Sequence, residues 1–168
     1  MTTQKFHNGE DREAIADASS LVEVVLGDAS ARRGPAKHYK PGDAHVSVES
    51  QGNFSRNPKD PSKGLIACRD RYSAELLNSD GDRIAIIKAS FVAAFSVVRE
   101  DDPDEVELEA FANSTGRLVI RPYAREFIQQ LSTRMGVPSF LLEVLRFQGT
   151  VVEDDANAAG GVLGDVGT

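Results

Sequence analysis

The chain has very few of the residues that stabilise secreted proteins or build redox sites. Its 168 residues include one cysteine, Cys68, and no tryptophan. A single cysteine cannot form a disulfide within the chain, and it has no second thiol with which to hold a metal ion. This cysteine usage is typical of a reducing compartment, so we expect a cytoplasmic protein.

Long apolar runs and excess basic charge are also missing. No run reaches the roughly 18 apolar residues that a membrane-spanning helix needs, and residues 1–20 lack the apolar centre of a signal peptide. The formal net charge is -7, whereas a surface that binds nucleic acid requires a basic face. We therefore expect one soluble domain, with no membrane insertion and no nucleic-acid partner.

Residue patterns of enzymes and metal sites are absent as well. None of the histidines has a cysteine or a carboxylate at the spacing of zinc ligands. Residues 78–89 begin like a calcium loop, but Arg83 takes the place of the required glycine and Ala89 that of the final acid. We predict no enzyme, no catalytic residue, no metal and no cofactor.

The clearest feature that the sequence does contain is a pair of strands. Residues 65–77 and 83–98 both alternate apolar with polar side chains, and Asp80-Gly81 between them is a hairpin signal. The second face of 83–98 carries apolar residues that one layer of helices leaves uncovered, which favours oligomerisation. These residues are Ile84, Ile86, Val92, Ala94 and Val98.

Two weaker strands are predicted before this hairpin. Residues 21–26 (LVEVVL) are rich in β-branched side chains, with Val22, Val24 and Leu26 on one face, and residues 46–48 mark the second strand. Between them, residues 28–43 are rich in glycine, proline and basic side chains, which predicts a solvated loop.

The second half of the chain is organised around residues 118–135, which predict an amphipathic helix. Gly136 takes the place of a left-handed cap and Pro138 prevents continuation. Residues 118–120, before Pro122, fit either a strand or an earlier helical turn. The apolar face is expected to carry Tyr123, Phe127, Leu131 and Met135, with Ala124 and Ile128 beside them.

An acidic segment precedes this long helix. Residues 100–109 (EDDPDEVELE) contain seven acids and no base. Because acids near a helix N-terminus suit the helix dipole, we expect a short helix that Asp102 caps and Gly116 ends. The fold class is therefore α+β, a four-stranded antiparallel sheet followed by a short and a long helix.

The ends of the chain are predicted to be less ordered than its centre. We expect a flexible segment at residues 1–19, a folded domain at 20–147 with an extended run at 139–147, and a disordered acidic tail at 148–168. Phe54 is expected in a loop after the second strand.

Three local motifs point to a known family. The stretch RPYAREFIQQLSTRMGVPSFLLEVLRF (121–147) opens with Pro-Tyr-Ala-Arg-Glu and carries a Gly-x-Pro turn, as the long helix of the SecB export chaperones does. The EDDP segment (100–103) and the TGR step (115–117) are more similar to the SecB-like chaperones found with toxin–antitoxin pairs. The resemblance covers about residues 20–147.

The resemblance implies a homotetramer, a dimer of dimers, whose apolar grooves hold unfolded polypeptides in extended form. Aromatic side chains are the candidates to line such a groove. They are Phe54, Phe91, Phe95, Phe111, Tyr123 and Phe127. The alternative is that several of them are core residues, because each buried large side chain contributes roughly 1.5 to 3 kcal/mol.

In the export family the resemblance also implies docking of the translocase motor SecA to acids on the outer face of the sheet. Asp28 matches one of those acids, whereas Arg32 and Lys88 stand where two others fall. Reversing two charges replaces attraction with repulsion, which opposes docking to SecA.

These observations predict an ATP-independent holdase, a chaperone that binds exposed apolar segments and prevents aggregation. The expected client is a cognate antitoxin, with secretory preproteins second. The alternative is a small-molecule-binding or enzymatic α+β domain that uses the cleft between sheet and helix, and a buried polar cluster there would favour it.

Overall fold

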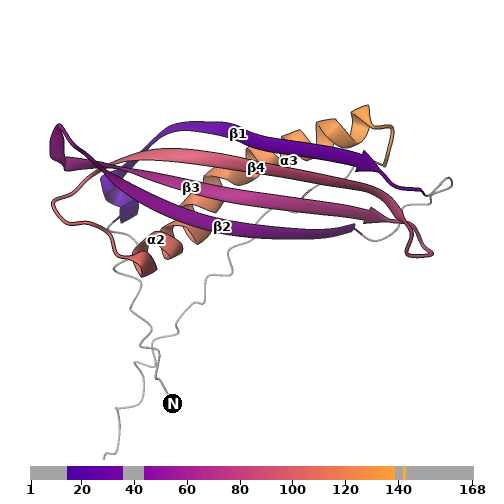
Figure 1. Ribbon diagram of the computed structural model, residues 1–168, viewed down its shortest axis with the longest axis horizontal. Coiled ribbons are helices and arrows are strands. Elements are labelled where there is room, and N and C mark those ends of the chain that lie inside the picture. The colour runs from indigo at the N-terminus through magenta and orange to yellow at the C-terminus, as the bar shows by residue number, and fades with distance from the viewer. Residues whose placement is uncertain (1–14, 36–43, 139–141, 143–168) are drawn as a thin grey trace, which may run out of the picture.

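The computed structural model describes residues 15–35, 44–138 and 142. Figure 1 shows one elongated β-sheet with its helices along a single face. The four strands are antiparallel neighbours in the order β1-β4-β3-β2. The predicted fold class is confirmed. The elements are β1 (Ser19–Arg33), β2 (Ala44–Asn57), β3 (Asp60–Leu77), β4 (Arg83–Val98), α2 (Glu105–Phe111), the π-helix η1 (Ala112–Gly116) and α3 (Arg117–Arg134).

The β3–β4 hairpin forms as its local signals predict. Gly81 has a φ of 85°, a left-handed conformation that glycine adopts without steric cost. The side-chain oxygen of Asn78 accepts hydrogen bonds from the backbone N–H groups of Asp80 (3.0 Å) and Asp82 (2.7 Å). The residues that resemble a calcium loop therefore form a tight turn.

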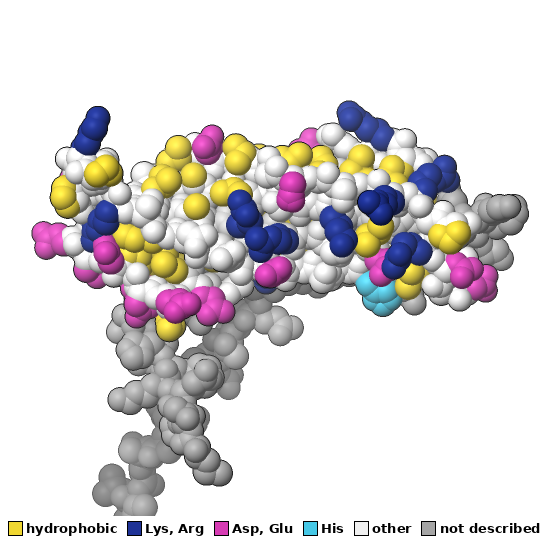
Figure 2. Space-filling view, in the orientation of Figure 1, with side chains coloured by type: hydrophobic (Ala, Val, Ile, Leu, Met, Phe, Trp, Pro, Cys, Tyr) yellow, Lys and Arg dark blue, Asp and Glu magenta, His cyan; other side chains and the backbone are white. Residues whose placement is uncertain are grey.

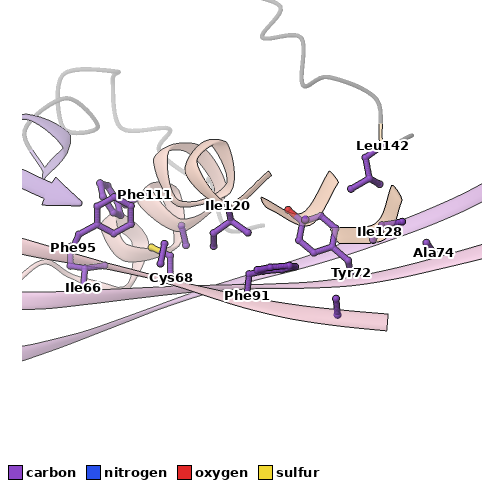
Figure 3. Packing of buried hydrophobic residues seen from close by; sticks show 14 of the residues in the cluster. Ile66, Cys68, Tyr72, Ala74, Phe91, Phe95, Phe111, Ile120, Ile128 and Leu142 are labelled. Atoms are coloured by element: carbon purple, nitrogen blue, oxygen red, sulfur yellow. The ribbon is translucent and has the colours of Figure 1, made fainter. Parts of the chain in front are cut away.

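The two faces of the sheet differ in burial because helices cover only one of them. On β3 and β4, every second residue points toward the helices and is buried, whereas most of the alternate residues are partly or fully exposed. Figure 3 shows how the side chains from the sheet meet those from the helices. The buried cluster includes Ile66, Cys68, Tyr72, Ile87, Phe91, Phe95, Phe111, Ile120, Ile128 and Leu142.

β1 is longer and less regular than predicted. It continues to Arg33, so part of the predicted basic loop is strand. Register shifts between Leu21 and Glu23, and again between Leu26 and Asp28, insert extra residues opposite β4. Val24 and Leu26 lie on the same face, opposite Ala93 and Phe91 of β4, as predicted, whereas Val22 falls at the first of these bulges, where the alternation of faces is interrupted.

β2 also extends beyond its predicted end. It runs to Asn57, so Phe54 lies within a strand and pairs with Ile66 of β3, and the prediction of a loop at Phe54 was wrong. The sequence of β2 is polar and weakly β-forming by itself. Its pairing with the neighbouring strand β3, from Asn57 opposite Asp60 to Ala44 opposite Leu76, decides its length.

The helical part of the chain is continuous from Glu105 to Arg134. Gly116 does not end a helix, because the π-helix η1 joins α2 directly to α3. Residues 118–120 are helical, which resolves the two alternatives in favour of an earlier turn. At the far end, Gly136 has a φ of 63°, as its predicted cap position requires.

The buried face of α3 is rotated from the predicted one. Its fully buried apolar residues are Ile120, Ala124 and Ile128, whereas Tyr123 is 47% exposed and Phe127 is half-buried. Both sets recur every fourth residue, so periodicity alone cannot choose between neighbouring stripes.

Two arginines hold the acidic segment against the sheet. Arg56 of β2 pairs with Asp102 and donates to the backbone carbonyls of Arg99 and Glu100, both at 2.8 Å. Arg99 pairs with Asp101 and, at 3.4 Å, with Glu107. These pairs reduce the repulsion among the acids that the sequence places together.

The remaining expectations concern the second face of β4 and the ends of the chain. Ile84 is buried with Val137 rather than open on the second face, whereas Val98 is 59% exposed. Within the predicted flexible segment, residues 15–18 form a helical turn that buries Ile15. The predicted tail at 148–168 lies outside the described residues.

Candidate functional site

Three of the six aromatic residues predicted to line a groove are buried in the core. Phe91, Phe95 and Phe111 are only 5%, 2% and 3% exposed. The rings of Phe95 and Phe111 meet edge-to-face with centroids 5.1 Å apart, so they join sheet to helix. A polypeptide bound to this conformation cannot reach them, and they act here as core residues.

The other three aromatic residues reach the surface. Phe54, on β2, lies over Gly64, where any larger residue would collide with its ring, and the guanidinium of Arg56 sits 5.5 Å from the ring centroid. Tyr123 and Phe127 lie one turn apart on α3. These three side chains remain candidates to contact a client.

The two flanks of α3 have opposite character. Arg117 reaches Ser50 on β2 at 3.1 Å, so its flank faces the β2 side of the sheet. With 3.6 residues per turn, Tyr123 and Phe127 fall on the other flank, toward β4 and β1. We call Val119, Tyr123 and Phe127 the α3 flank. The ring of Phe127 meets that of Phe91 of β4 with centroids 5.8 Å apart.

An exposed apolar edge lies next to this flank. Leu26 of β1 pairs with Phe91, the residue that contacts Phe127, so β1 continues the same surface. We call the exposed apolar residues of β1 the β1 edge; they are Leu21, Val22, Val25 and Leu26, at 43–58% exposure. Leu21 and Leu26 face the helix side, opposite Phe95 and Phe91, whereas Val25 lies opposite Val92 on the outer face. The sequence shows that these residues are apolar, but not that β1 is an edge strand without a helix above it.

A buried polar cluster lies under the other flank of α3. Asp70 is 1% exposed and accepts hydrogen bonds from the hydroxyls of Ser50 (2.5 Å) and Tyr72 (3.1 Å). The guanidinium nitrogen Nε of Arg117 lies 4.0 Å from the carboxylate of Asp70. Burial and the Asp70 charge raise the pKa of Tyr72. The cluster thus ties β2, β3 and the start of α3 together.

This cluster bears on the small-molecule alternative, which predicted polar groups in the cleft between sheet and helix. Its members bond to one another, and no buried side-chain nitrogen or oxygen of the described residues lacks a hydrogen-bond partner. No donor or acceptor is left directed at a ligand. The cluster positions α3, and it gives the alternative no support.

The TGR step has a structural role at the same junction. Gly116 is pressed against Cys68 so closely that a Cβ at this position would lie 2.7 Å from the Cβ of Cys68 and 2.8 Å from its Sγ. Arg117, the next residue, reaches Asp70. Burial, and then the charge of Asp70, raise the pKa of the Cys68 thiol to about 12.

Known proteins share part of this sequence and most of this fold. No protein-family profile matches the chain. Over 46 residues, 27% of this chain, it is 48% identical to the SecB-like chaperone Rv1957 of Mycobacterium tuberculosis strain H37Rv, and equally to the SecB-like chaperone MT2006 of strain CDC 1551. That match spans only 25% of the length of those relatives.

A solved structure extends the similarity to most of the chain. The Mycobacterium tuberculosis Rv1957 SecB-like chaperone, in complex with a ChAD peptide from the Rv1956 HigA1 antitoxin, matches with a TM-score of 0.63 and 26% identity over 82% of this chain and 96% of that one. The chain has the fold of a SecB-like chaperone. The SecB-like resemblance stated from the motifs is therefore confirmed, including its tie to toxin–antitoxin chaperones.

The outer face of this SecB-like sheet carries the residue expected to dock a partner. Asp28 is exposed on β1 opposite Ser90 of β4. Arg32 and Lys88 lie on the same face and are exposed. The register therefore places the matching acid and the two reversed charges on one surface.

Two other features of the described residues bear on function. None of the helices described is long and apolar enough to cross a membrane. Within the same part of the chain, no group of three or more histidines, cysteines or acids is arranged to hold a metal ion.

Proposed function

We propose that this chain is an ATP-independent holdase of the SecB-like type, and that its client is an antitoxin. The observation that carries the proposal is the match to a SecB-like chaperone whose structure contains an antitoxin peptide. The exposed apolar side chains of the α3 flank give a physical basis for it. An unfolded segment binds there because its apolar side chains leave water.

The client binds in extended form across the helix side of the sheet. Tyr123 and Phe127 contact its apolar side chains, and Phe54 provides a further contact at β2. β2 is an edge strand, so its outer backbone groups are available for main-chain hydrogen bonds. Such bonds do not depend on sequence, which suits a protein that holds unfolded segments.

Subunits assemble through the β1 edge into a homotetramer, a dimer of dimers. Apolar side chains such as Leu21 and Leu26, 47% and 46% exposed, are a liability for a monomer, and a second copy covers them. The free thiol of Cys68 suits the cytoplasm as the place where the tetramer acts.

Secretory preproteins are the second class of client, and SecA is not proposed as a partner. Arg32 and Lys88 lie near Asp28 on the outer face, so the acidic surface that docking to SecA requires is not formed. Pull-down with the purified protein tests this ranking. Recovery of preproteins and SecA without an antitoxin would reverse it.

Light scattering of an aggregating client tests the holdase itself. Sub-stoichiometric to equimolar chaperone is expected to suppress scattering without added nucleotide. Tyr123→Ser is expected to weaken client binding, because it removes the most exposed aromatic of the α3 flank. Val98→Ser is the matched control: it removes an exposed apolar side chain from the outer face and should leave client binding unchanged. Equal loss in both variants would contradict the assignment of the client to the helix side.

A further inference from the structure

Basic side chains are concentrated on one half of the outer face of the sheet. Figure 2 shows them gathered over β1, β4 and β3 toward the end of the sheet where β1 finishes. Arg32 pairs with Ile86, and Lys88 lies two residues further along β4, so the two are diagonal neighbours. Arg71 and Arg69 continue this line on β3. We call Arg32, Lys88, Arg71 and Arg69 the basic diagonal.

Most of the basic diagonal is not neutralised within the chain. Among the described residues, Arg32, Arg69 and Lys88 have no acidic partner, and Arg71 pairs with Glu49 at 3.6 Å at one edge. Two further acids lie on this half of the face. Glu75 already pairs with Arg83, and Asp28 is the one that remains unpaired.

This arrangement is unusual in a chain with 26 acids and 19 lysines and arginines. Because acids outnumber basic residues, every exposed lysine and arginine could have had an acidic partner. Instead, the acidic segment is held by Arg56 and Arg99, where β2 and β4 end. Charge is therefore segregated along the sheet, which creates a local field that a partner of opposite sign can use.

The middle of the diagonal is surrounded by small polar residues, whereas Ile86 and Val92 lie opposite its two ends, Arg32 and Arg69. Ser30 and Ser73 lie on either side of Lys88, and Ser90 lies beside Arg71. Small side chains let an extended backbone approach the cations closely. The aromatic residues of β3 and β4 all face the helices, so this surface offers no ring on which a nucleic-acid base can stack.

We propose that the basic diagonal docks an extended acidic segment of another protein. From Arg32 to Arg69 the diagonal covers about 20 Å along the strands and about 10 Å across them. An extended peptide of about seven residues spans that length. A segment with several Asp or Glu residues pairs with the three free cations, while Asp28 and Glu49 limit binding to partners whose acids match their spacing.

A regular phosphate backbone fits this surface less well. Double-stranded DNA presents about one negative charge per 1.7 Å, so it cannot avoid the acids interspersed in the diagonal. An acidic peptide can place serine or glycine opposite them. The inference concerns the outer face and does not depend on the holdase activity proposed for the helix side.

Fluorescence anisotropy with a fluorescein-labelled peptide of seven glutamates tests the proposal on the full-length protein. Saturable binding is expected at low ionic strength and should be lost near 1 M salt, where the Debye length is about 3 Å. Lys88→Glu and Arg69→Glu should each weaken it at least about tenfold, because a charge that attracted the peptide now repels it.

Lys59→Glu is the matched control. Lys59 lies exposed in the turn between β2 and β3, and its substitution changes the net charge by the same amount. It should weaken binding less than about twofold, since exposed charges beyond a Debye length of about 10 Å are screened. Holdase activity of Lys88→Glu should equal that of the unmodified chain, which separates failure of this inference from failure of the proposed function.

Three results would overturn the inference. The first is no saturable binding of the acidic peptide, and the second is an equal loss in Lys59→Glu and Lys88→Glu. The third is tighter binding, with the same dependence on Lys88, of a single-stranded oligonucleotide or of phosphatidylserine vesicles. That result would assign the diagonal to nucleic acid or membrane instead.

Discussion

Gly116 and Cys68 meet where the helical segment crosses β3, and their contact limits both positions. Helix propensity alone favours alanine over glycine by about 1 kcal/mol. At Gly116 the added methyl would lie 2.7 Å from the Cβ of Cys68, an atom that cannot move without its strand. Sterics and propensity therefore oppose each other at this residue.

Gly116→Ala is expected to destabilise the fold by about 1 to 3 kcal/mol, the usual cost of overpacking a core. Urea denaturation measures the change. Asn113→Ala, at an exposed position of the same π-helix, should stay within about 0.5 kcal/mol of the unmodified chain. A Gly116→Ala variant more stable than the unmodified protein would mean that this contact is not formed.

Cys68 makes stability depend on alkaline pH. Its thiol has a pKa of about 12 in the fold against 9.0 for a thiol exposed to water, because burial disfavours the thiolate. Below pH 9 the thiol is protonated in both the folded and the unfolded protein, so its contribution to the free energy of unfolding is complete. Between these values only the unfolded thiol ionises, so stability falls on the order of 1 kcal/mol per pH unit.

Urea denaturation between about pH 8 and about pH 11 tests this linkage. Stability should fall with rising pH, and Cys68→Ala should reduce the slope. Some slope should remain, because the pKa of Tyr72 is raised in the same direction. An unchanged slope in Cys68→Ala would show that the thiol is not the group responsible.

At the scale of elements, the cap of α2 lies two residues after the one that the sequence predicted. The N-cap is Asp104 rather than Asp102: its carboxylate accepts from the backbone N–H of Glu107 (2.7 Å), and the Glu107 carboxylate accepts from that of Asp104 (2.9 Å). Asp102 is drawn instead to Arg56, a residue of β2. A distant partner thus decided which acid caps the helix.

Asp104→Ala should cost about 1 kcal/mol, because it removes the cap of a seven-residue helix. Asp104→Asn should restore most of the loss, since asparagine caps as well as aspartate. Asp101→Ala, which removes an exposed ion pair with Arg99, should cost less. The capping assignment would be contradicted if thermal or urea unfolding showed a larger loss of stability for Asp101→Ala than for Asp104→Ala.

At the scale of the whole molecule, the β1 edge is the surface through which we propose that subunits assemble. A single chain of 18.1 kDa leaves Leu21 and Leu26 about half exposed on the side of the sheet that carries the helices. The helices pack mainly against β2, β3 and β4, so among the described residues Leu21 and Leu26 of β1 stay about half exposed, although Val24 and Ala31 reach the core. A second copy covers the two leucines in the proposed tetramer.

Leu26→Asp is expected to convert the tetramer to a smaller species, because the edge then carries a charge that a second copy must desolvate. Light scattering coupled to gel filtration measures the mass at micromolar concentration. Val98 belongs to the outer-face set from which the sequence predicted oligomerisation, so Val98→Asp places the same charge on that alternative interface. It should leave the mass unchanged if subunits meet through the β1 edge. A mass of one chain for the unmodified protein would refute the tetramer.

The sequence correctly predicted those elements that are determined by residues close together in the chain. The β3–β4 hairpin follows from alternation and from Asp80-Gly81, and the end of the long helix follows from Gly136. The motifs within 121–147 and at 115–117 also carried the family resemblance. Each of these depends on neighbours within a few residues, which a sequence displays directly.

The candidate site was only partly predictable. Of six aromatic residues, the sequence could not distinguish the buried Phe95 from the exposed Tyr123, because both are apolar at regular spacing. It also missed Leu21 and Leu26, whose exposure follows from the position of β1 at the edge of the sheet. Burial is a property of the assembled layers.

By itself the sequence determined an acidic α+β chain with one thiol, a hairpin and a long helix that ends at a glycine. Only the tertiary structure decided which stripe of α3 is buried, how far β1 and β2 extend, and that unpaired cations share the outer face. The physical reason is that these properties depend on pairing and packing between residues distant in sequence, such as Arg32 and Lys88.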